Sequence, residues 1–185
     1  MTELLIKSIL ASPYRQFRSG GYRVNLTTIR RVDVEEEGQL LVRLDEHIFL
    51  PADRFLLEDW KDYECYVLEV ESIGMIGSCA VRRDSTLADD EDEFVCASGT
   101  LFCGSIGVLP QYQRQGFGLL LKAWTIAYAH SLKCVRVVSN MRESNGASIG
   151  LSSRFGFHVT RRIPDFYEDP VETAVVMELV LTSAP

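Results

Sequence analysis

The sequence lacks several features that would place it in common protein classes. It has no run of 18 apolar residues, and Glu3 and Lys7 interrupt its apolar N-terminal stretch, so it predicts neither a membrane-spanning helix nor a secretion signal. Basic residues are also not in excess, because 19 Lys and Arg face 26 Asp and Glu, a formal net charge of -7. Nucleic acids and anionic membranes are bound through Lys and Arg, so we expect neither as a partner and favour a cationic substrate.

Paired cysteines are absent as well. The five cysteines are an odd number, none forms a CxxC motif, and three lie in apolar runs where a cysteine usually behaves as a small core residue. We therefore predict reduced thiols, no metal site and a cytoplasmic protein.

What is present favours one mixed domain. The chain has 185 residues and 46% hydrophobic composition, enough to bury a substantial core, and it shows no internal repeat. Predicted strands and helices alternate along the whole length. We expect an α/β fold: a single twisted mixed sheet with helices on both faces. Residues 1–21 form an N-terminal extension with apolar residues at helical spacing, and residues 22–185 form the domain.

Apolar periodicity and turn residues predict the order of elements. The first half contains a strand over 22–32, a helix capped by Asp33 with Leu40, Leu41 and Leu44 on one face, a short helix from Pro51 that includes Phe55, Leu56 and Trp60, and a hairpin of strands over 65–70 and 75–82. The second half contains a helix after Gly116, a strand over 133–138, a helix capped by Ser144, a strand over 157–163, a polar loop over 164–170 and a strand over 174–181.

An acidic run, Asp89 to Glu93, separates the hairpin from the second half. Five like charges in a row are typical of a solvated loop. The same run could also attract a cationic substrate, and the sequence leaves both interpretations open.

The stretch LFCGSIGVLPQYQRQGFGLLL, residues 101–121, indicates a strand, a tight loop and a helix. A helix start leaves backbone N–H groups without partners and carries partial positive charge, and glycines there let a ligand approach closely. We therefore predict a phosphate-bearing ligand. The spacing excludes two nucleotide motifs, because no Lys-Ser or Lys-Thr follows the glycines and Gly118 is followed only by leucines where GxGxxG requires another glycine.

Gln113-x-x-Gly116-x-Gly118 resembles the [QR]xxGx[GA] pyrophosphate loop of the GNAT superfamily of acetyl-CoA-dependent N-acetyltransferases. A second motif of that family, an NxxS/A helix ending in a GF step, is similar to Asn145-x-x-Ser148 followed by Gly156-Phe157. The resemblance implies a GNAT fold, acetyl-CoA as co-substrate, and an amine-bearing acceptor. It places the cofactor at Ile106, Gly107, Val108, Gln113, Arg114, Gln115, Gly116, Phe117, Gly118, Asn145 and Ser148.

Acetyl transfer to an amine needs a neutral amine, a polarised thioester carbonyl and a proton for the leaving thiolate. In many members of the family a tyrosine seven residues after the helix-opening Asn supplies that proton, but Ser152 stands there. A serine hydroxyl is a poor acid. We therefore take Tyr167 and Glu143 as further candidates for acid and base, with His158 as another and water as the alternative.

The acceptor is less well defined. The resemblance places Phe49, Pro51, Phe166 and Tyr167 at the acceptor site, and the Phe166-Tyr167 tail is similar to a Tyr-Tyr pair in N-terminal protein acetyltransferases of the ribosomal-protein type. The expected acceptor is a peptide or protein N-terminus or a small-molecule amine. A non-catalytic acetyl-CoA-binding sensor or scaffold is the alternative function, and a homodimer is left open.

Overall fold

The computed structural model describes residues 15–18, 21–24, 27–83 and 99–181, and the side chains from residue 27 onward. The predicted helical spacing of residues 1–14 and the acidic run from Asp89 to Glu93 lie outside these ranges. Arg15–Arg18 and Gly21–Val24 are strands β1 and β2, which pair in a separate two-stranded sheet. The predicted strand over 22–32 is therefore divided, and only its second part joins the main sheet.

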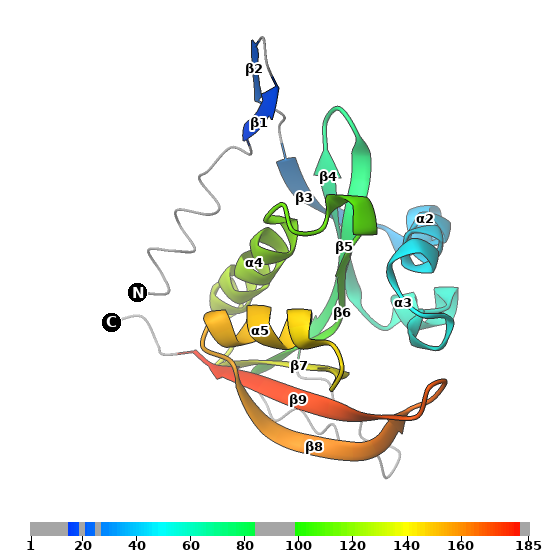
Figure 1. Cartoon of the computed structure of the whole chain (residues 1–185), viewed down its shortest axis with the longest axis vertical. Coiled ribbons are helices and arrows are strands. Elements are labelled where there is room, and N and C mark those ends of the chain that lie inside the picture. The colour runs from blue at the N-terminus through cyan, green and yellow to red at the C-terminus, as the bar shows by residue number, and fades with distance from the viewer. Residues whose placement is uncertain (1–14, 19–20, 25–26, 84–98, 182–185) are drawn as a thin grey trace.

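Seven strands form one mixed sheet in the order β3-β4-β5-β6-β7-β9-β8 (Figure 1). Among the described strands, β6 and β7 form the one parallel pair of this sheet, and the other neighbours are antiparallel. The strands are β3 Thr27–Val32, β4 Glu64–Val70, β5 Gly74–Arg83, β6 Thr100–Val108, β7 Arg136–Arg142, β8 His158–Tyr167 and β9 Glu172–Val180.

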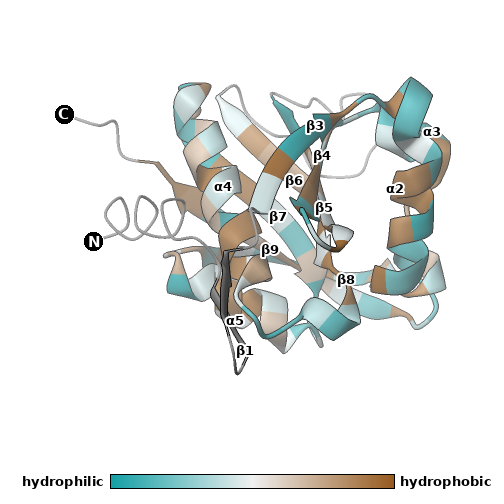
Figure 2. Ribbon diagram, turned by 90° about the horizontal axis from the view of Figure 1, so that it is seen from above, coloured by the Kyte–Doolittle hydropathy of each residue, from teal (hydrophilic) through white to brown (hydrophobic). Residues whose placement is uncertain are grey.

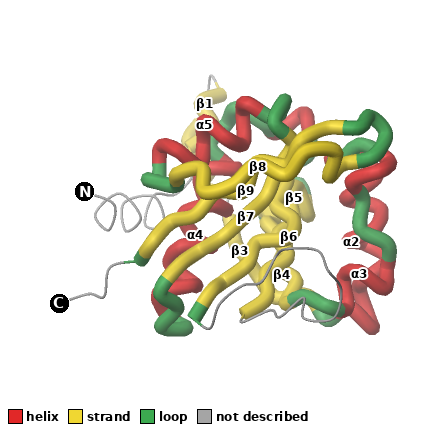
Figure 3. The backbone as a smooth tube through the Cα atoms, turned by 90° about the horizontal axis from the view of Figure 1, so that it is seen from below, coloured by secondary structure: helices red, strands yellow, loops and turns green. Residues whose placement is uncertain are grey.

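Helices cover both faces of the sheet, as the sequence predicts (Figure 2). Helices α2 and α3 lie on one face, and α4 and α5 lie on the other, an arrangement that Figure 3 shows from below. Their bounds are α2 Val34–Ile48, α3 Leu57–Lys61, α4 Phe117–Ser131 and α5 Gly146–Arg154, with short 3-10 helices η1 Pro51–Asp53 and η2 Pro110–Tyr112.

Each helical layer buries its own hydrophobic cluster against the sheet. Leu121 and Ile126 of α4 belong to the larger cluster, whereas Leu41 of α2 and Trp60 of α3 belong to the smaller one. Asp33 caps α2 as predicted, accepting a hydrogen bond from the Glu35 N–H. The predicted apolar face of α2 is narrower than expected, because Leu40 is 40% exposed.

The predicted helix from Pro51 is broken in two. Pro51 opens the 3-10 turn η1, and α3 begins only at Leu57. Side-chain acceptors take the intervening N–H groups: Phe55 N–H donates to Asp45 Oδ2 at 3.1 Å, and Leu56 N–H donates to an oxygen of Asp59. Hydrogen bonds to side chains therefore replace the helical ladder at this point.

Two predicted boundaries in the second half are also wrong. Strand β7 begins at Arg136, because Lys133 adopts a positive φ of 58° in the turn that ends α4. Strand β8 continues to Tyr167, through the predicted polar loop and past Pro164. A proline is tolerated there because β8 is the edge strand, and its register with β9 shifts between Ile163 and Tyr167.

Asp45 is a fully buried acid on α2. Burial raises the pKa of this carboxyl from 3.8 to about 7, so the folded chain binds its proton more tightly than the unfolded chain does. Between about pH 4 and about pH 7 the folded state holds more protons, and stability therefore falls as pH rises through this range.

Asp45→Asn should remove this pH dependence while keeping an oxygen for the Phe55 N–H. We expect the variant to have a higher free energy of unfolding than the wild type at about pH 8, by at most about 4 kcal/mol, and therefore a higher unfolding temperature there. At about pH 4 the two should unfold at similar temperatures. Thermal unfolding at both pH values measures this. Glu46→Gln, at the exposed neighbouring position of α2, should change neither value, and an unchanged slope in Asp45→Asn would contradict the assignment.

Candidate active site

The parallel strands β6 and β7 separate part of the way along their length. They pair from Thr100 opposite Arg136 to Cys103 opposite Ser139, and both strands then continue without pairing to each other. Beyond this last rung, β6 remains paired with β5 and β7 with β9. The backbone of residues 104–108 therefore faces the gap, and no described strand pairs with it on that side. N–H groups there are available to an extended ligand.

A cavity of about 700 Å³ lies over this gap, a volume typical of small-molecule sites. Its walls come from both faces of the sheet. Phe49, Asp53 and Tyr63 line it from the α2–α3 side, whereas Lys122, Asn145 and Ser148 line it from the α4–α5 side.

Residues 113–118, called here the glycine loop, lead from the end of β6 into the first turn of α4. They leave the start of this helix accessible. Gln113 Nε2 donates to the Val108 carbonyl at 3.0 Å and so fixes the loop to the end of β6. Gly116 caps α4 with a φ of 94°, a conformation that favours glycine. A Cβ atom built on Gly118 would meet only Leu151 Cδ2, at 3.6 Å. The first turn of a 15-residue helix is therefore open to an anion.

Asn145 opens α5 and provides its N-terminal cap. The prediction that Ser144 does so is wrong, because Asn145 Oδ1 accepts the Ser148 N–H at 3.0 Å. The Ser144 hydroxyl donates instead to Glu172 at 3.1 Å. The side chain of Asn145 therefore shapes the helix start beside the cavity.

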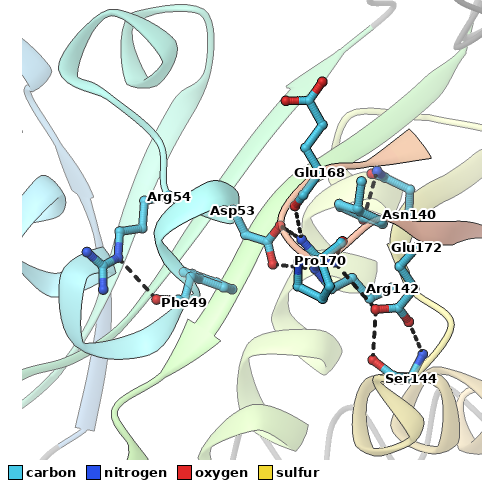
Figure 4. A network of polar contacts seen from close by, with 10 residues as sticks. Phe49, Asp53, Arg54, Asn140, Arg142, Ser144, Glu168, Pro170 and Glu172 are labelled. Atoms are coloured by element: carbon cyan, nitrogen blue, oxygen red, sulfur yellow. Dashed lines mark hydrogen bonds and ion pairs between the residues drawn. The ribbon is translucent and has the colours of Figure 1, made fainter. Parts of the chain in front are cut away.

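A buried ion pair between Arg142 and Asp53 lies in the cavity wall, and Figure 4 shows its contacts. The guanidinium of Arg142, 7% exposed, donates to both oxygens of Asp53 at 2.7 and 2.8 Å and to the carbonyls of Glu168 and Pro170 at 2.8 Å. Glu172 completes the network at 3.4 Å. The hydrogen bonds that Arg142 donates to Asp53 are the main reason that the pKa of Arg142 is raised. The network joins η1 to β7 and to the turn between β8 and β9.

Tyr167 ends β8 and lines the cavity. Its Oη accepts a hydrogen bond from Asn140 Nδ2 at 3.2 Å, and its ring centroid lies 4.6 Å from the Arg142 guanidinium carbon. Burial raises the pKa of Tyr167 to about 12, so the hydroxyl keeps its proton at neutral pH. Because Asn140 donates to the oxygen, the Tyr167 hydrogen can be donated to a group in the cavity.

Comparison with known proteins decides the family. The model of the acetyltransferase (GNAT) family matches residues 34–157. The chain belongs to the GNAT family. It is an acyltransferase that uses acetyl-CoA, and the family match favours an enzyme over the sensor alternative.

Solved structures share the GNAT fold with this chain at low sequence identity. The ribosomal-protein-S18-alanine N-acetyltransferase of Escherichia coli is 20% identical, with a TM-score of 0.68 over 86% of this chain and 97% of that one. The Salmonella typhimurium protein yncA, solved with its cofactor acetyl-CoA, is 23% identical, with a TM-score of 0.63 over 86% and 98%. An IAA acetyltransferase from Bacillus cereus is 16% identical, with a TM-score of 0.66 over 84% and 100%. No curated protein sequence matches this chain significantly.

The GNAT cavity brings together some of the residues that the sequence indicates. Ile106, Asn145 and Ser148 line it together with Phe49, Phe166 and Tyr167. The other predicted cofactor residues, Gly107, Val108 and the loop over 113–118, lie outside this lining, as does Pro51. Gly107 instead packs against α2 and the residue after it, because a Cβ atom there would lie 2.4 Å from Ile48 and 2.8 Å from Phe49.

The remaining catalytic candidates of this GNAT protein lie outside the cavity lining. Glu143 accepts a hydrogen bond from Arg162 at 2.9 Å at the exposed surface. Ser152 is fully buried in α5, and His158 is exposed on β8.

Sequence reasoning missed three groups that line the GNAT cavity: the pair of Asp53 and Arg142, Asn140 beside Tyr167, and Lys122. The first two depend on residues 89 and 27 positions apart, which no local pattern joins. Lys122 had a local signal, because it is a charged residue in a helix that is apolar on most of its circumference.

No described helix is long and apolar enough to cross a membrane. Within the described ranges, no three His, Cys, Asp or Glu side chains form a group that could hold a metal ion. Cys65, Cys79, Cys103 and Cys134 are buried free thiols, and Cys96 lies outside the described residues.

Proposed function

We propose that this protein is an N-acetyltransferase that transfers the acetyl group of acetyl-CoA to a primary amine, with a peptide or protein N-terminus as the favoured acceptor and a small-molecule amine as the alternative. The observation that carries the proposal is the cavity over the gap between β6 and β7, which reaches both faces of the sheet. On one face of the sheet the glycine loop leads into α4, and the other face provides aromatic and acidic side chains.

The residues present fit acetyl-CoA, which supplies an activated acetyl thioester when it is bound. The first turn of α4, with the open approach at Gly118, would hold the pyrophosphate, together with Gln113, Arg114, Gln115 and Phe117 of the loop. The unpaired edge of β6, with Ile106 to Val108, would bind the pantetheine arm and polarise the carbonyl through backbone N–H groups. Asn145 and Ser148 lie across the gap from this edge.

The acceptor side provides carboxylates and a hydroxyl. Asp62 and Glu168 line the cavity, and no ion pair between described residues involves either side chain. Such carboxylates attract a cationic amine and can accept the proton that it releases. A peptide α-amino group, with an unperturbed pKa of about 7.7–8.0, needs less help in losing its proton than a lysine amine at about 10.4.

The tail supports the acceptor class that we favour. Phe166 and Tyr167 form an edge-to-face pair with ring centroids 5.0 Å apart at the cavity wall. The pair occupies the position at which N-terminal protein acetyltransferases with a similar tail have two tyrosines. The E. coli structure of similar fold is named as a ribosomal-protein-S18-alanine N-acetyltransferase. Both points favour a peptide N-terminus.

A panel of acceptors tests this proposal. Peptides with different N-terminal residues, the same peptides with blocked N-termini, and small amines are incubated with acetyl-CoA while free CoA thiol is measured. We expect thiol release with peptides whose N-terminus is free and none with the blocked forms. Release with small amines alone would favour the alternative acceptor, and no release with any amine would contradict the proposed function.

Tyr167→Phe should lower turnover, because it removes the hydroxyl that we place as proton donor or as acceptor-binding group. We expect kcat to fall about 10- to 100-fold while the affinity for acetyl-CoA stays unchanged, since the glycine loop lies outside this part of the site. Steady-state kinetics and calorimetry measure the two quantities. Tyr112→Phe, outside the cavity lining, is the matched control, and an unchanged kcat in Tyr167→Phe would exclude the role.

A further inference from the structure

Lys122 is a buried ammonium without a described acceptor. It lies in the middle of α4, its side chain is 1% exposed, and its Nζ has no hydrogen-bond partner among the described residues. The Phe157 ring centroid, 5.0 Å from Nζ, offsets only part of the cost of burying the charge. A buried charge without a counter-charge is strongly unfavourable, so its presence requires a reason.

Two of the other cations that line the cavity have hydrogen-bond partners, and the third packs against aromatic rings. Arg142 is bound by Asp53, and Arg54 donates to the carbonyls of Phe49 and Glu46 at 3.1 and 2.9 Å. The guanidinium carbon of Arg82 lies 4.9 Å from the ring centroid of Tyr63. Its Nε has no hydrogen-bond partner among the described residues, but the residue is only partly buried. Lys122 is the fully buried member of this set, and it therefore provides a positive charge that the described residues do not neutralise.

The position of Lys122 indicates which negatively charged group of a bound ligand could pair with it. Lys122 lines the cavity together with Cys103 and Ser139, the last residues at which β6 and β7 pair. Ser139 Oγ is also buried without a partner. The positive charge of Lys122 helps to lower the pKa of the Cys103 thiol, after the larger effect of a hydrogen bond from Cys79, so it already acts on a sulfur at this point.

The glycine loop joins β6 at the far end of the same unpaired edge. The pantetheine arm of a CoA molecule whose phosphates lie at α4 would follow β6 from Val108 toward Cys103. This path covers five residues, about 17 Å, and ends where Cys103 pairs with Ser139. The sulfur at the end of such an arm approaches the closed end of the gap, where Lys122 lies.

We propose that Lys122 is a catalytic residue of this enzyme: its ammonium is the charge partner of the CoA sulfur as that sulfur leaves. The inference rests on the proposed function. In the step it assists, the amine nitrogen forms a bond to the acetyl carbon, the carbon–sulfur bond breaks, and the electron pair goes to sulfur. The nitrogen loses its proton to a cavity base or water, and the sulfur is protonated by solvent on release. A positive charge beside the sulfur stabilises the negative charge that develops there.

Lys122→Met tests this role, because the methionine side chain has a volume similar to that of lysine and carries no charge. We expect kcat to fall about tenfold or more with little change in the KM for acetyl-CoA, because the charge acts on the leaving sulfur. The apo variant should unfold at a higher temperature than the wild type, since an unpaired buried charge has been removed. Lys133→Met, which removes an exposed lysine after α4, should change neither value. A lower unfolding temperature with unchanged kcat would show a purely structural lysine and overturn the proposal.

A second measurement does not depend on any acceptor. The thiolate of bound CoA is titrated by ultraviolet absorbance, with the complex of desulfo-CoA subtracted to remove the protein cysteines. We expect the pKa of the bound thiol to rise by roughly one to three units in Lys122→Met, and to keep its wild-type value in Cys103→Ala. If CoA binds to both proteins and its thiol has the same pKa in the wild type and in Lys122→Met, the inference is overturned. Failure of CoA to bind the wild type would instead contradict the proposed function.

Discussion

Gly118→Asp should abolish acetyl-CoA binding. The new carboxylate would occupy the open approach to the first turn of α4 and oppose the negative charge of a pyrophosphate. Juxtaposed like charges cost several kcal/mol, so affinity in calorimetry should fall at least about a hundredfold. The apo variant should unfold at nearly the wild-type temperature, because an acid in the first helical turn is mildly stabilising and the nearest side-chain atom, on Leu151, is 3.6 Å from the new Cβ.

The control for this variant is Gly150→Asp. Gly150 lies exposed in α5 with no atom within 4 Å of a Cβ built there, so the same charge is added away from the loop. This control should bind acetyl-CoA, and both the control and the wild type should unfold at a higher temperature when acetyl-CoA is present. Normal binding by Gly118→Asp would contradict the placement of the pyrophosphate, and no thermal shift in the wild type would contradict the use of this site altogether.

Arg142→Leu should destabilise the protein strongly. Removing one partner of a buried ion pair leaves the Asp53 carboxylate and the carbonyls of Glu168 and Pro170 without their donor. Such losses typically cost about 3–5 kcal/mol, which for a chain of this size lowers the unfolding temperature by about 10 °C. Denaturant unfolding measures the free energy directly.

Arg162→Leu provides the matched control. It removes an ion pair with Glu143 whose two side chains are 59% and 50% exposed. Pairs of this kind contribute about 0–1 kcal/mol, so the control should unfold close to the wild type. Equal destabilisation in the two variants would mean that burial of Arg142 does not strengthen its network.

The parts of the fold that the sequence predicts well depend on short-range chemistry. The turn from β6 into α4 requires the backbone freedom of Gly116, and the apolar residues after it specify a buried helix. The cap of α2 by Asp33 and the end of α5 at Gly156 follow equally local rules. The first of these features, the turn into α4, also forms the part of the candidate site that we propose to bind phosphate.

The parts that were predicted wrongly or missed depend on contacts between distant segments. The helix predicted from Pro51 is interrupted because Asp45 takes the Phe55 N–H. Strand β8 passes Pro164 because no described strand pairs with its outer edge. Asp53 meets Arg142 across 89 positions. Periodicity describes one element at a time, so it cannot show which acceptors a neighbouring element will provide.

The short parallel pairing between β6 and β7 has a consequence for the order of folding. Strands β3 to β6 and strands β7 to β9 are two consecutive stretches of chain, each held by antiparallel neighbours, and four rungs join them after the α4 crossover. Pairings that span a long connection carry a larger loop-closure entropy and form late. We therefore infer that the seam between the two stretches closes last, so that the ability to bind acetyl-CoA marks a chain that has completed folding.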